Sequence, residues 1–177
     1  MSFELSSERL ILRPLRPGDA PVLAVYRDDP AVARYQGWEL PYTVQDAEVL
    51  IAEMAGRIPG DEGWVQIGLE RRGTGALIGD VALNTHERQA ELGVTLSAAG
   101  QGQGYALEGV RALLTHAFGP LKLEQVVAEI DPRNVAVMRL LLLLGFRHKV
   151  TSYGTYLHRG EWTDNAVYIL TGEEWLT

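Results

Sequence analysis

The segment Gln101–Ala106, with the sequence Gln-Gly-Gln-Gly-Tyr-Ala, has the residue types of an anion-binding turn. Its two glycines, Gly102 and Gly104, can adopt backbone conformations closed to other residues, and they let a ligand approach the main chain. A strand-like run, Ala90–Leu96, precedes the turn, and a periodic apolar helix pattern follows it. Free N–H groups and the dipole at the start of that helix favour negative charge, so the segment predicts a phosphate or pyrophosphate site.

Two common glycine-rich motifs do not fit this turn. A Walker phosphate loop needs Lys and Ser/Thr directly after its last glycine, and Tyr105 and Ala106 stand there. A dinucleotide fingerprint needs a small residue where Leu107 stands. The pattern that fits is Gln/Arg-x-x-Gly-x-Gly/Ala, read as Gln101, Gly104 and Ala106.

Glu91, on the strand that leads to the turn, is the candidate general base. The alternative is a carboxylate that faces solvent, because the side chains of a strand alternate between its two faces. His86 and Glu87 begin like a zinc-binding helix motif, but Ala90 stands where the second His is required, so we expect no metal site. The sequence has no Gly-x-Ser-x-Gly elbow, which argues against a serine hydrolase.

Composition narrows the classes of function. The 177 residues predict a single domain over positions 1–177. The formal charge of −7 argues against a nucleic-acid partner and suits a cationic or amine substrate, so local N–H groups must hold any anionic ligand. Cysteine is absent, so acyl transfer through an acyl-cysteine is excluded and any transfer is expected to be direct.

The chain has no apolar run near the roughly 20 residues that span a bilayer. Its first residues also lack a basic, apolar signal region. We therefore expect a cytoplasmic protein with no membrane partner.

Hydrophobic periodicity predicts a mixed order of strands and helices. Asp19 is expected to cap the first helix, and Thr43 with Asp46 is expected to form a capping box for the second long one. The predicted strands are 8–15, 64–70, 76–83, 88–96, 123–130, 146–157 and 162–170, and the predicted helices are 20–26, 44–56, 105–118 and 134–144.

The last predicted helix contains five consecutive leucines, Leu140–Leu144, and has little polar face. Such a helix is either deeply buried or packed on a partner, which leaves a homodimer possible. We expect deep burial.

The motifs ERLILRPL, PYTVQDAE, ALIGDVAL, AELGV, QGQGYALEGVRALLTHAF, NVAVMRLLLLLGF and RGEWTDNAVYIL together cover almost the whole chain in order. This set resembles the GNAT N-acetyltransferases of the RimJ/RimL type. The resemblance implies an α/β fold with a central, mostly antiparallel sheet that is splayed at the cofactor site and flanked by helices on both faces. It also implies acetyl-CoA as co-substrate.

Acetyl-CoA would then lie between the strand that ends at Leu96 and the strand that starts near Leu123. Main-chain groups of the first strand would bind the pantetheine arm and polarise the thioester. Asn134 is assigned to the catalytic and cofactor site by the resemblance, and its alternative is a helix N-cap. The residues implied to bind the cofactor are Val94, Thr95, Leu96, Gln101, Gly102, Gln103, Gly104, Tyr105, Ala106, Leu107 and Asn134.

The sequence departs from the family where a proton donor for the leaving thiolate is expected. Rim-type enzymes carry Ser where Val137 stands, and many relatives carry Tyr where Leu141 stands. Water, Tyr153 or Tyr156 could substitute. Three further aromatic residues could line the substrate groove, or they could be ordinary core residues: Trp38, Tyr42 and Trp64.

The resemblance implies direct transfer of an acetyl group to a primary amine, with a protein or peptide N-terminal α-amine as the first candidate. An α-amino group has a pKa of about 7.7–8.0, so it needs a weaker base than lysine does. The alternatives are a small amine, such as a polyamine or an aminoglycoside, and a non-catalytic acyl-CoA-binding module.

Overall fold

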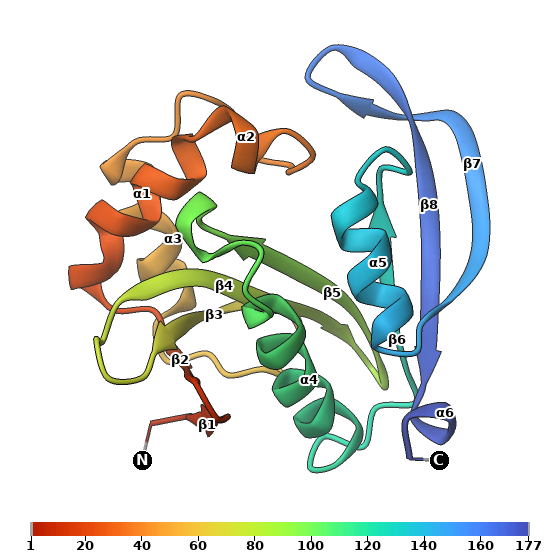
Figure 1. Cartoon of the computed structure of the whole chain (residues 1–177), viewed down its shortest axis with the longest axis horizontal. Helices are drawn as coiled ribbons and strands as arrows, with labels where there is room; N and C mark the ends of the chain where they lie inside the picture. The colour runs from red at the N-terminus through yellow and green to blue at the C-terminus, as the bar shows by residue number, and fades with distance from the viewer. Residues whose placement is uncertain (1, 177) are drawn as a thin grey trace.

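A computed structural model describes residues 2–176, and its centre is one eight-stranded sheet. The strand order is β1-β2-β3-β4-β5-β6-β8-β7, and β5 with β6 is the one parallel pair among these neighbours (Figure 1). The predicted mixed α/β, mostly antiparallel fold is therefore confirmed. The strands are β1 (Leu5–Ser6), β2 (Leu10–Pro14), β3 (Gly63–Arg71), β4 (Leu77–His86), β5 (Gln89–Leu96), β6 (Gln125–Ile130), β7 (Arg147–His158) and β8 (Glu161–Thr171).

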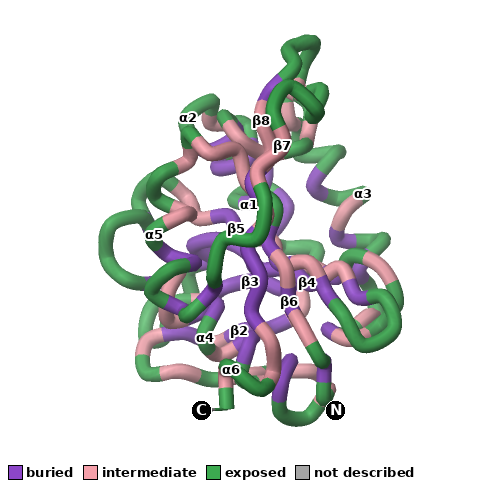
Figure 2. The backbone as a smooth tube through the Cα atoms, turned by 90° about the vertical axis from the view of Figure 1, so that its right-hand side faces the viewer, coloured by how far each residue is buried: buried purple, intermediate pink, exposed green. Residues whose placement is uncertain are grey.

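Helices cover both faces of this sheet, as the resemblance implied. One core contains the apolar sides of α4 and α5, and a second core on the opposite face contains those of α1 and α3. Figure 2 shows buried residues through the middle of the sheet, whereas most residues of β7 and of the hairpin tip are exposed. Within residues 2–176, no helix is both long and apolar enough to cross a bilayer. The helices are α1 (Ala20–Asp28), α2 (Pro30–Ala33), α3 (Val44–Met54), α4 (Tyr105–Phe118), α5 (Val135–Leu143) and α6 (Gly172–Leu176).

The sheet opens between β5 and β6. Their pairing lasts for three residues and ends at Glu91 opposite Val127, while β5 continues to Leu96 and β6 continues to Ile130. Beyond this point the two strands diverge (Figure 1), and the lining residues place the gap cavity described below between them. Because β5 and β6 are parallel, α4 must cross over between them, and its N-terminus lies beside the end of β5.

The two predicted helix caps have different outcomes. The capping box of Thr43 and Asp46 is confirmed, since each side chain accepts a hydrogen bond from the other residue's backbone N–H. Asp19 precedes α1, but its side chain does not cap the helix. Its carboxylate instead accepts hydrogen bonds from the Arg13 guanidinium at 2.8 and 3.0 Å and from the Arg16 N–H at 2.7 Å. Asp19 therefore forms a buried ion pair with Arg13 instead of capping α1.

The prediction that the leucine run is deeply buried is wrong for part of α5. Leu141 is fully buried against the sheet, whereas Leu142 and Leu143 are 51% and 70% exposed. The reason is geometric, since α5 lies on one face of the sheet and its outer side is not covered by any other element of residues 2–176 (Figure 1).

A buried ion pair joins α1 to the middle of β4. Arg27 Nη2 donates to Asp80 Oδ1 at 2.9 Å, and both side chains are less than a tenth exposed. Tyr26 donates its hydroxyl to the other oxygen of the same carboxylate. The Arg27 guanidinium also lies over the ring of Trp38, whose indole N–H donates to the Arg27 carbonyl. The pair therefore also holds the loop that follows α2.

This ion pair gives a first prediction. Asp80→Ala leaves the Arg27 charge buried without its carboxylate, so the free energy of unfolding should fall by about 3–5 kcal/mol. Glu124→Ala breaks a surface pair with Arg88, whose side chains are 59% and 66% exposed, and it should cost less than about 1 kcal/mol. Urea unfolding followed by circular dichroism measures both. Equal losses in the two variants would contradict the assigned role of the buried pair.

Candidate active site

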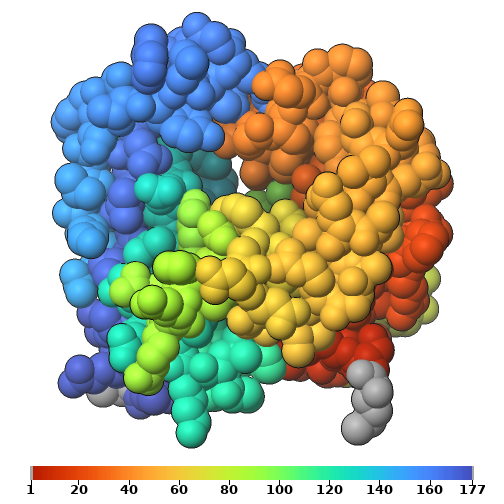
Figure 3. Space-filling view, turned by 180° about the vertical axis from the view of Figure 1, so that it is seen from behind, coloured from red at the N-terminus to blue at the C-terminus, as the bar shows by residue number. Residues whose placement is uncertain are grey.

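Three cavities meet where β5 and β6 part. The turn cavity, of 370 Å³, lies beside the glycine turn and α5, and the groove, of 520 Å³, lies beside α3 and the β7–β8 hairpin. A gap cavity of 80 Å³ lies between the two diverging strands. Tyr35, Gln36 and Val94 line all three. From behind, Figure 3 shows a hollow between the orange segment around α2 and the blue hairpin.

The glycine turn leads into α4 without a side-chain cap. Gly102 and Gly104 have φ of +75° and +81°, and Gly104 stands at the N-cap of α4 without a side chain to satisfy the first N–H groups. Seven of the residues that the resemblance implied line the turn cavity, and they are Val94, Thr95, Leu96, Gln101, Gly102, Ala106 and Asn134. The other four do not line it, and they are Gln103, Gly104, Tyr105 and Leu107.

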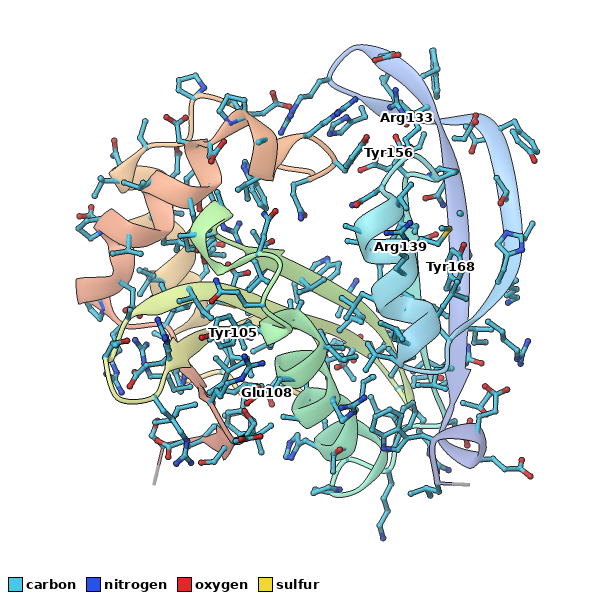
Figure 4. The ribbon with its side chains drawn as sticks, in the orientation of Figure 1. Tyr105, Glu108, Arg133, Arg139, Tyr156 and Tyr168 are labelled. Carbon is cyan, nitrogen blue, oxygen red and sulfur yellow. The ribbon has the colours of Figure 1, made fainter. Side chains whose placement is uncertain are left out.

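Tyr105 has a different partner, Arg9, which the sequence did not single out. The Arg9 guanidinium lies 4.3 Å from the centre of the Tyr105 ring, and its Nη1 donates to the Gln103 carbonyl at 2.9 Å. Its Nε donates to Glu108 at 2.7 Å. Figure 4 shows Tyr105 and Glu108 on the side of α4 that faces away from α5. These contacts hold the turn, and no local pattern links positions so far apart in the chain.

The N-cap alternative for Asn134 is confirmed, and its role at a cofactor site stays a prediction. Its Oδ1 accepts a long hydrogen bond of 3.4 Å from the Val137 N–H, so it caps α5, and its side also lines the turn and gap cavities. Val137 and Leu141 line the gap cavity as well, and Leu141 has no exposed surface. The wall therefore carries aliphatic groups at both positions where a hydroxyl was expected, and it cannot donate a proton from them.

The floor of the groove is the face of the sheet opposite α4. The registers of β3, β4 and β5 place Trp64, Asn84 and Glu91 in one row, and the small residues Ala82 and Gly93 lie in the next. A Cβ on Gly93 would lie 3.3 Å from the Trp64 ring, so the indole covers this glycine.

The aromatic predictions for the groove are met in part. Trp38, Trp64 and Tyr156 line it. Tyr42 does not, because it lies against Trp38 with ring centres 6.0 Å apart and contacts the α1–α3 core. Tyr153 is 77% exposed on the hairpin and lines none of the three cavities, so it is wrong as a substitute proton donor.

Glu91 points into the groove and is half-buried there. Burial raises the pKa of its carboxyl to about 6, and the charge of Glu129 and a hydrogen bond with it add to the rise, while a hydrogen bond with Asn84 opposes it. A carboxyl with this pKa is largely ionised at neutral pH and is a stronger base than an ordinary glutamate. The arrangement can accept a proton from a cationic group in the groove.

Tyr35 is a second group that the sequence did not single out. Its phenol lines all three cavities, and the guanidinium groups of Arg34 and Arg133 lie 5.1 and 5.8 Å from its ring centre. Figure 4 shows Arg133 and Tyr156 above the top of α5, below the turn of the β7–β8 hairpin. Tyr35 is the one phenol that lines the gap cavity among the described residues.

The tip of the hairpin holds the loop that carries Tyr35. The imidazole Nε2 of His158 lies 2.7 Å from the Gln36 carbonyl, and Arg159 Nη2 donates to the Trp38 carbonyl at 2.7 Å. Gln36 in turn donates its side-chain amide to the Val94 carbonyl of β5 at 3.2 Å. Segments about 120 residues apart in the chain therefore form the rim of the groove.

Comparison with known sequences points to one family. A family model described as "Acetyltransferase (GNAT) domain" matches residues 9–147. The chain is also 32% identical over 146 residues to the uncharacterized N-acetyltransferase YoaA of Bacillus subtilis, and the match covers 81% of this chain and 82% of that protein.

Solved structures with low sequence identity share the fold. An acetyltransferase of the GNAT family from Bacillus anthracis superposes with a TM-score of 0.86 at 22% identity, over 97% of this chain and 100% of that one. Mycobacterium smegmatis RimJ, in complex with CoA-disulfide, superposes with a TM-score of 0.84 at 20% identity, over 99% and 89% of the two chains.

The environment of Glu91 gives a second prediction. A ¹³C NMR titration of the Glu91 carboxyl should show a midpoint near pH 6. Asn84→Ala removes a hydrogen bond that favours the ionised form, so the midpoint should rise. Thr85→Val, on the opposite face of the same strand, should leave it unchanged. A midpoint near the ordinary value of about 4.3 would show that burial does not act on this group.

Proposed function

Because this chain belongs to the GNAT acetyltransferase family, an enzyme family that uses acyl-CoA, we propose that it transfers an acetyl group from acetyl-CoA to a primary amine. The proposed acceptor is the α-amine at a protein or peptide N-terminus, as in RimJ/RimL-type enzymes. One observation carries the proposal. A cavity beside an anion-binding turn and a groove with an ionisable carboxylate meet at Val94.

The turn cavity suits the anionic half of the co-substrate. Main-chain N–H groups at the start of α4, behind Gly102 and Gly104, would hold the pyrophosphate, and the backbone of Val94–Leu96 would bind the pantetheine arm. A chain of net charge −7 repels an anion at long range, so these local dipoles must supply the attraction. Arg9 supports them by fixing the Gln103 carbonyl.

In the groove, Glu91 would take a proton from the substrate ammonium, so that the neutral nitrogen can attack the thioester carbonyl. The pKa of the Glu91 carboxyl, about 6, differs less from the pKa of an α-ammonium, about 7.7–8.0, than from that of a lysine side chain, about 10.4. Proton transfer from an α-ammonium therefore costs less. Positioning the amine against the carbonyl supplies a further large part of the rate.

The leaving thiolate needs a proton that Val137 and Leu141 cannot give. Tyr35 is the phenol that borders both the turn cavity and the groove, and it would replace the family's donor. The chain has no cysteine to carry the acetyl group, so transfer would run through a ternary complex of enzyme, acetyl-CoA and amine. Double-reciprocal plots at several amine concentrations should then intersect.

A small cationic amine is the second candidate acceptor. The carboxylates of Glu53, Glu91 and Glu129 line the groove together with Trp38 and Trp64, and this combination also suits a diamine or polyamine. A peptide differs from these amines in having one cationic group next to an amide.

The function is tested with a panel of amines assayed for release of free CoA thiol. N-terminal peptides should be acetylated faster than polyamines, aminoglycosides or lysine analogues. Glu91→Gln should lower kcat by roughly 100-fold or more, with the largest loss for the most basic amines, and should leave acetyl-CoA affinity nearly unchanged. Glu87→Gln, an exposed residue beyond the end of β4, is the matched control. Binding of acetyl-CoA without thiol release from any amine would favour a non-catalytic module.

The glycine turn gives a further prediction. Gly102→Val places a side chain at the mouth of the turn cavity, where no atom lies within 4 Å of a Cβ, so the fold should persist. The loss of close approach to the backbone should raise the Kd for acetyl-CoA by roughly tenfold or more. Gly56→Val has the same backbone strain, with φ of +76° against +75°, and lies after α3 outside the three cavities. Calorimetry that gives equal Kd values for the two folded variants would contradict the proposed role of the turn.

A further inference from the structure

Glu91 has a neighbour on the next strand that no sequence motif indicated. The β5–β6 register pairs Glu91 with Val127, which places Glu129, two residues further along β6, on the same face of the sheet. Glu129 lines both the groove and the gap cavity, and its side chain is exposed. The second carboxylate therefore stands where the two strands diverge, on the groove side.

The two carboxylates lie within a row of four polar side chains that crosses four strands. The β4–β5 register places Asn84 beside Glu91, and the β6–β8 register places Asn165 on the same face as Glu129. Asn84 hydrogen-bonds with Glu91, the two glutamates hydrogen-bond with each other, and Asn165 Nδ2 donates to Glu129 Oε1 at 3.2 Å. An amide at each end thus orients a central pair of carboxyl groups.

Other groups that face this pair do not neutralise it. Arg27, from α1, is already paired with Asp80, and α3 contributes a further carboxylate, Glu53. The loop after α2 and the hairpin contribute the phenols of Tyr35 and Tyr156. Trp64, from β3, is uncharged. Two adjacent carboxylates with no cation of their own in the groove favour a bound cation.

We propose that Glu129 is a second catalytic carboxylate, which binds the acceptor ammonium together with Glu91 and accepts the second proton that the nitrogen must lose. This inference rests on the proposed function. It specifies that the acceptor is an amine that binds in its protonated form. The nitrogen of this amine must be accessible to both carboxylates.

The balance of protons explains the need for two acceptors. An ammonium nitrogen, R–NH₃⁺, loses one proton to Glu91 before its lone pair forms the bond to the thioester carbon. As the C–S bond breaks and its electron pair leaves on sulfur, the nitrogen loses a second proton to become the neutral amide. Glu91 is then already protonated, so Glu129 takes this one. One of these protons replaces the proton that Tyr35 gives to the thiolate sulfur, and the other is released to water.

The test is the pH dependence of Glu129→Gln. Its kcat/KM should fall by roughly tenfold or more at neutral pH, because one proton acceptor is lost. The acidic limb of its pH–rate profile should also move to lower pH, since Glu91 loses the neighbouring negative charge that opposes its ionisation. Glu129→Asp keeps the charge and should restore most of the rate. Glu48→Gln, an exposed residue on the outer side of α3, should match the wild type.

A titration of the Glu91 carboxyl by ¹³C NMR separates this inference from the function itself. Its midpoint should fall in Glu129→Gln, whether or not an acceptor is known. An active wild type whose rate and pH profile are unchanged in Glu129→Gln would overturn the second carboxylate and leave the acetyltransferase function standing. A Glu91 midpoint unaffected by Glu129→Gln would also overturn it. If Glu129→Gln lowers kcat/KM but does not shift the acidic limb of the pH–rate profile, Glu129 has a structural role and the proposal is overturned.

Discussion

The early end of the β5–β6 pairing is the constraint on which the rest of the site depends. After Glu91 and Val127, the facing edges of the two strands no longer have each other as hydrogen-bond partners, and buried backbone groups must be paired. One such group, the Val94 carbonyl, accepts from Gln36. The same divergence leaves the space in which the three cavities meet, and it brings the N-terminus of α4 to that space. A ligand with amide groups is therefore expected at this edge.

Opposite electrostatic environments lie on the two sides of this gap. On the side of α4, backbone N–H groups without a side-chain cap lie at the glycine turn, which suits an anion, and the nearby Arg9 is paired with Glu108. On the side of the groove, Glu91 and Glu129 stand together with no unpaired cation among the lining residues described, which suits an ammonium. This arrangement would separate the two proposed reactants by charge before they meet. Local groups would have to supply the attraction, because the net charge of −7 alone would repel the proposed anionic co-substrate.

The rim of the groove depends on contacts between distant parts of the chain. The buried pair of Arg27 and Asp80 fixes α1 to the sheet, and Arg27 carries Trp38 and its loop. The tip of the β7–β8 hairpin then bonds to the carbonyls of the same loop through His158 and Arg159. Tyr35 is placed at the junction of the cavities by this arrangement. Its role could not be predicted from its neighbours in the sequence.

The sequence by itself determined most of the elements and the glycine turn, because these depend on local causes: side-chain period, capping chemistry and the positive φ of Gly102 and Gly104. It also determined that the protein has no thiol to carry an acetyl group. Only the tertiary structure decided which face Glu91 occupies, since one step of strand register reverses every side chain. It likewise brought Glu129 beside Glu91, because that contact depends on how two strands pair across a helical crossover, a long-range event with no local pattern in the chain.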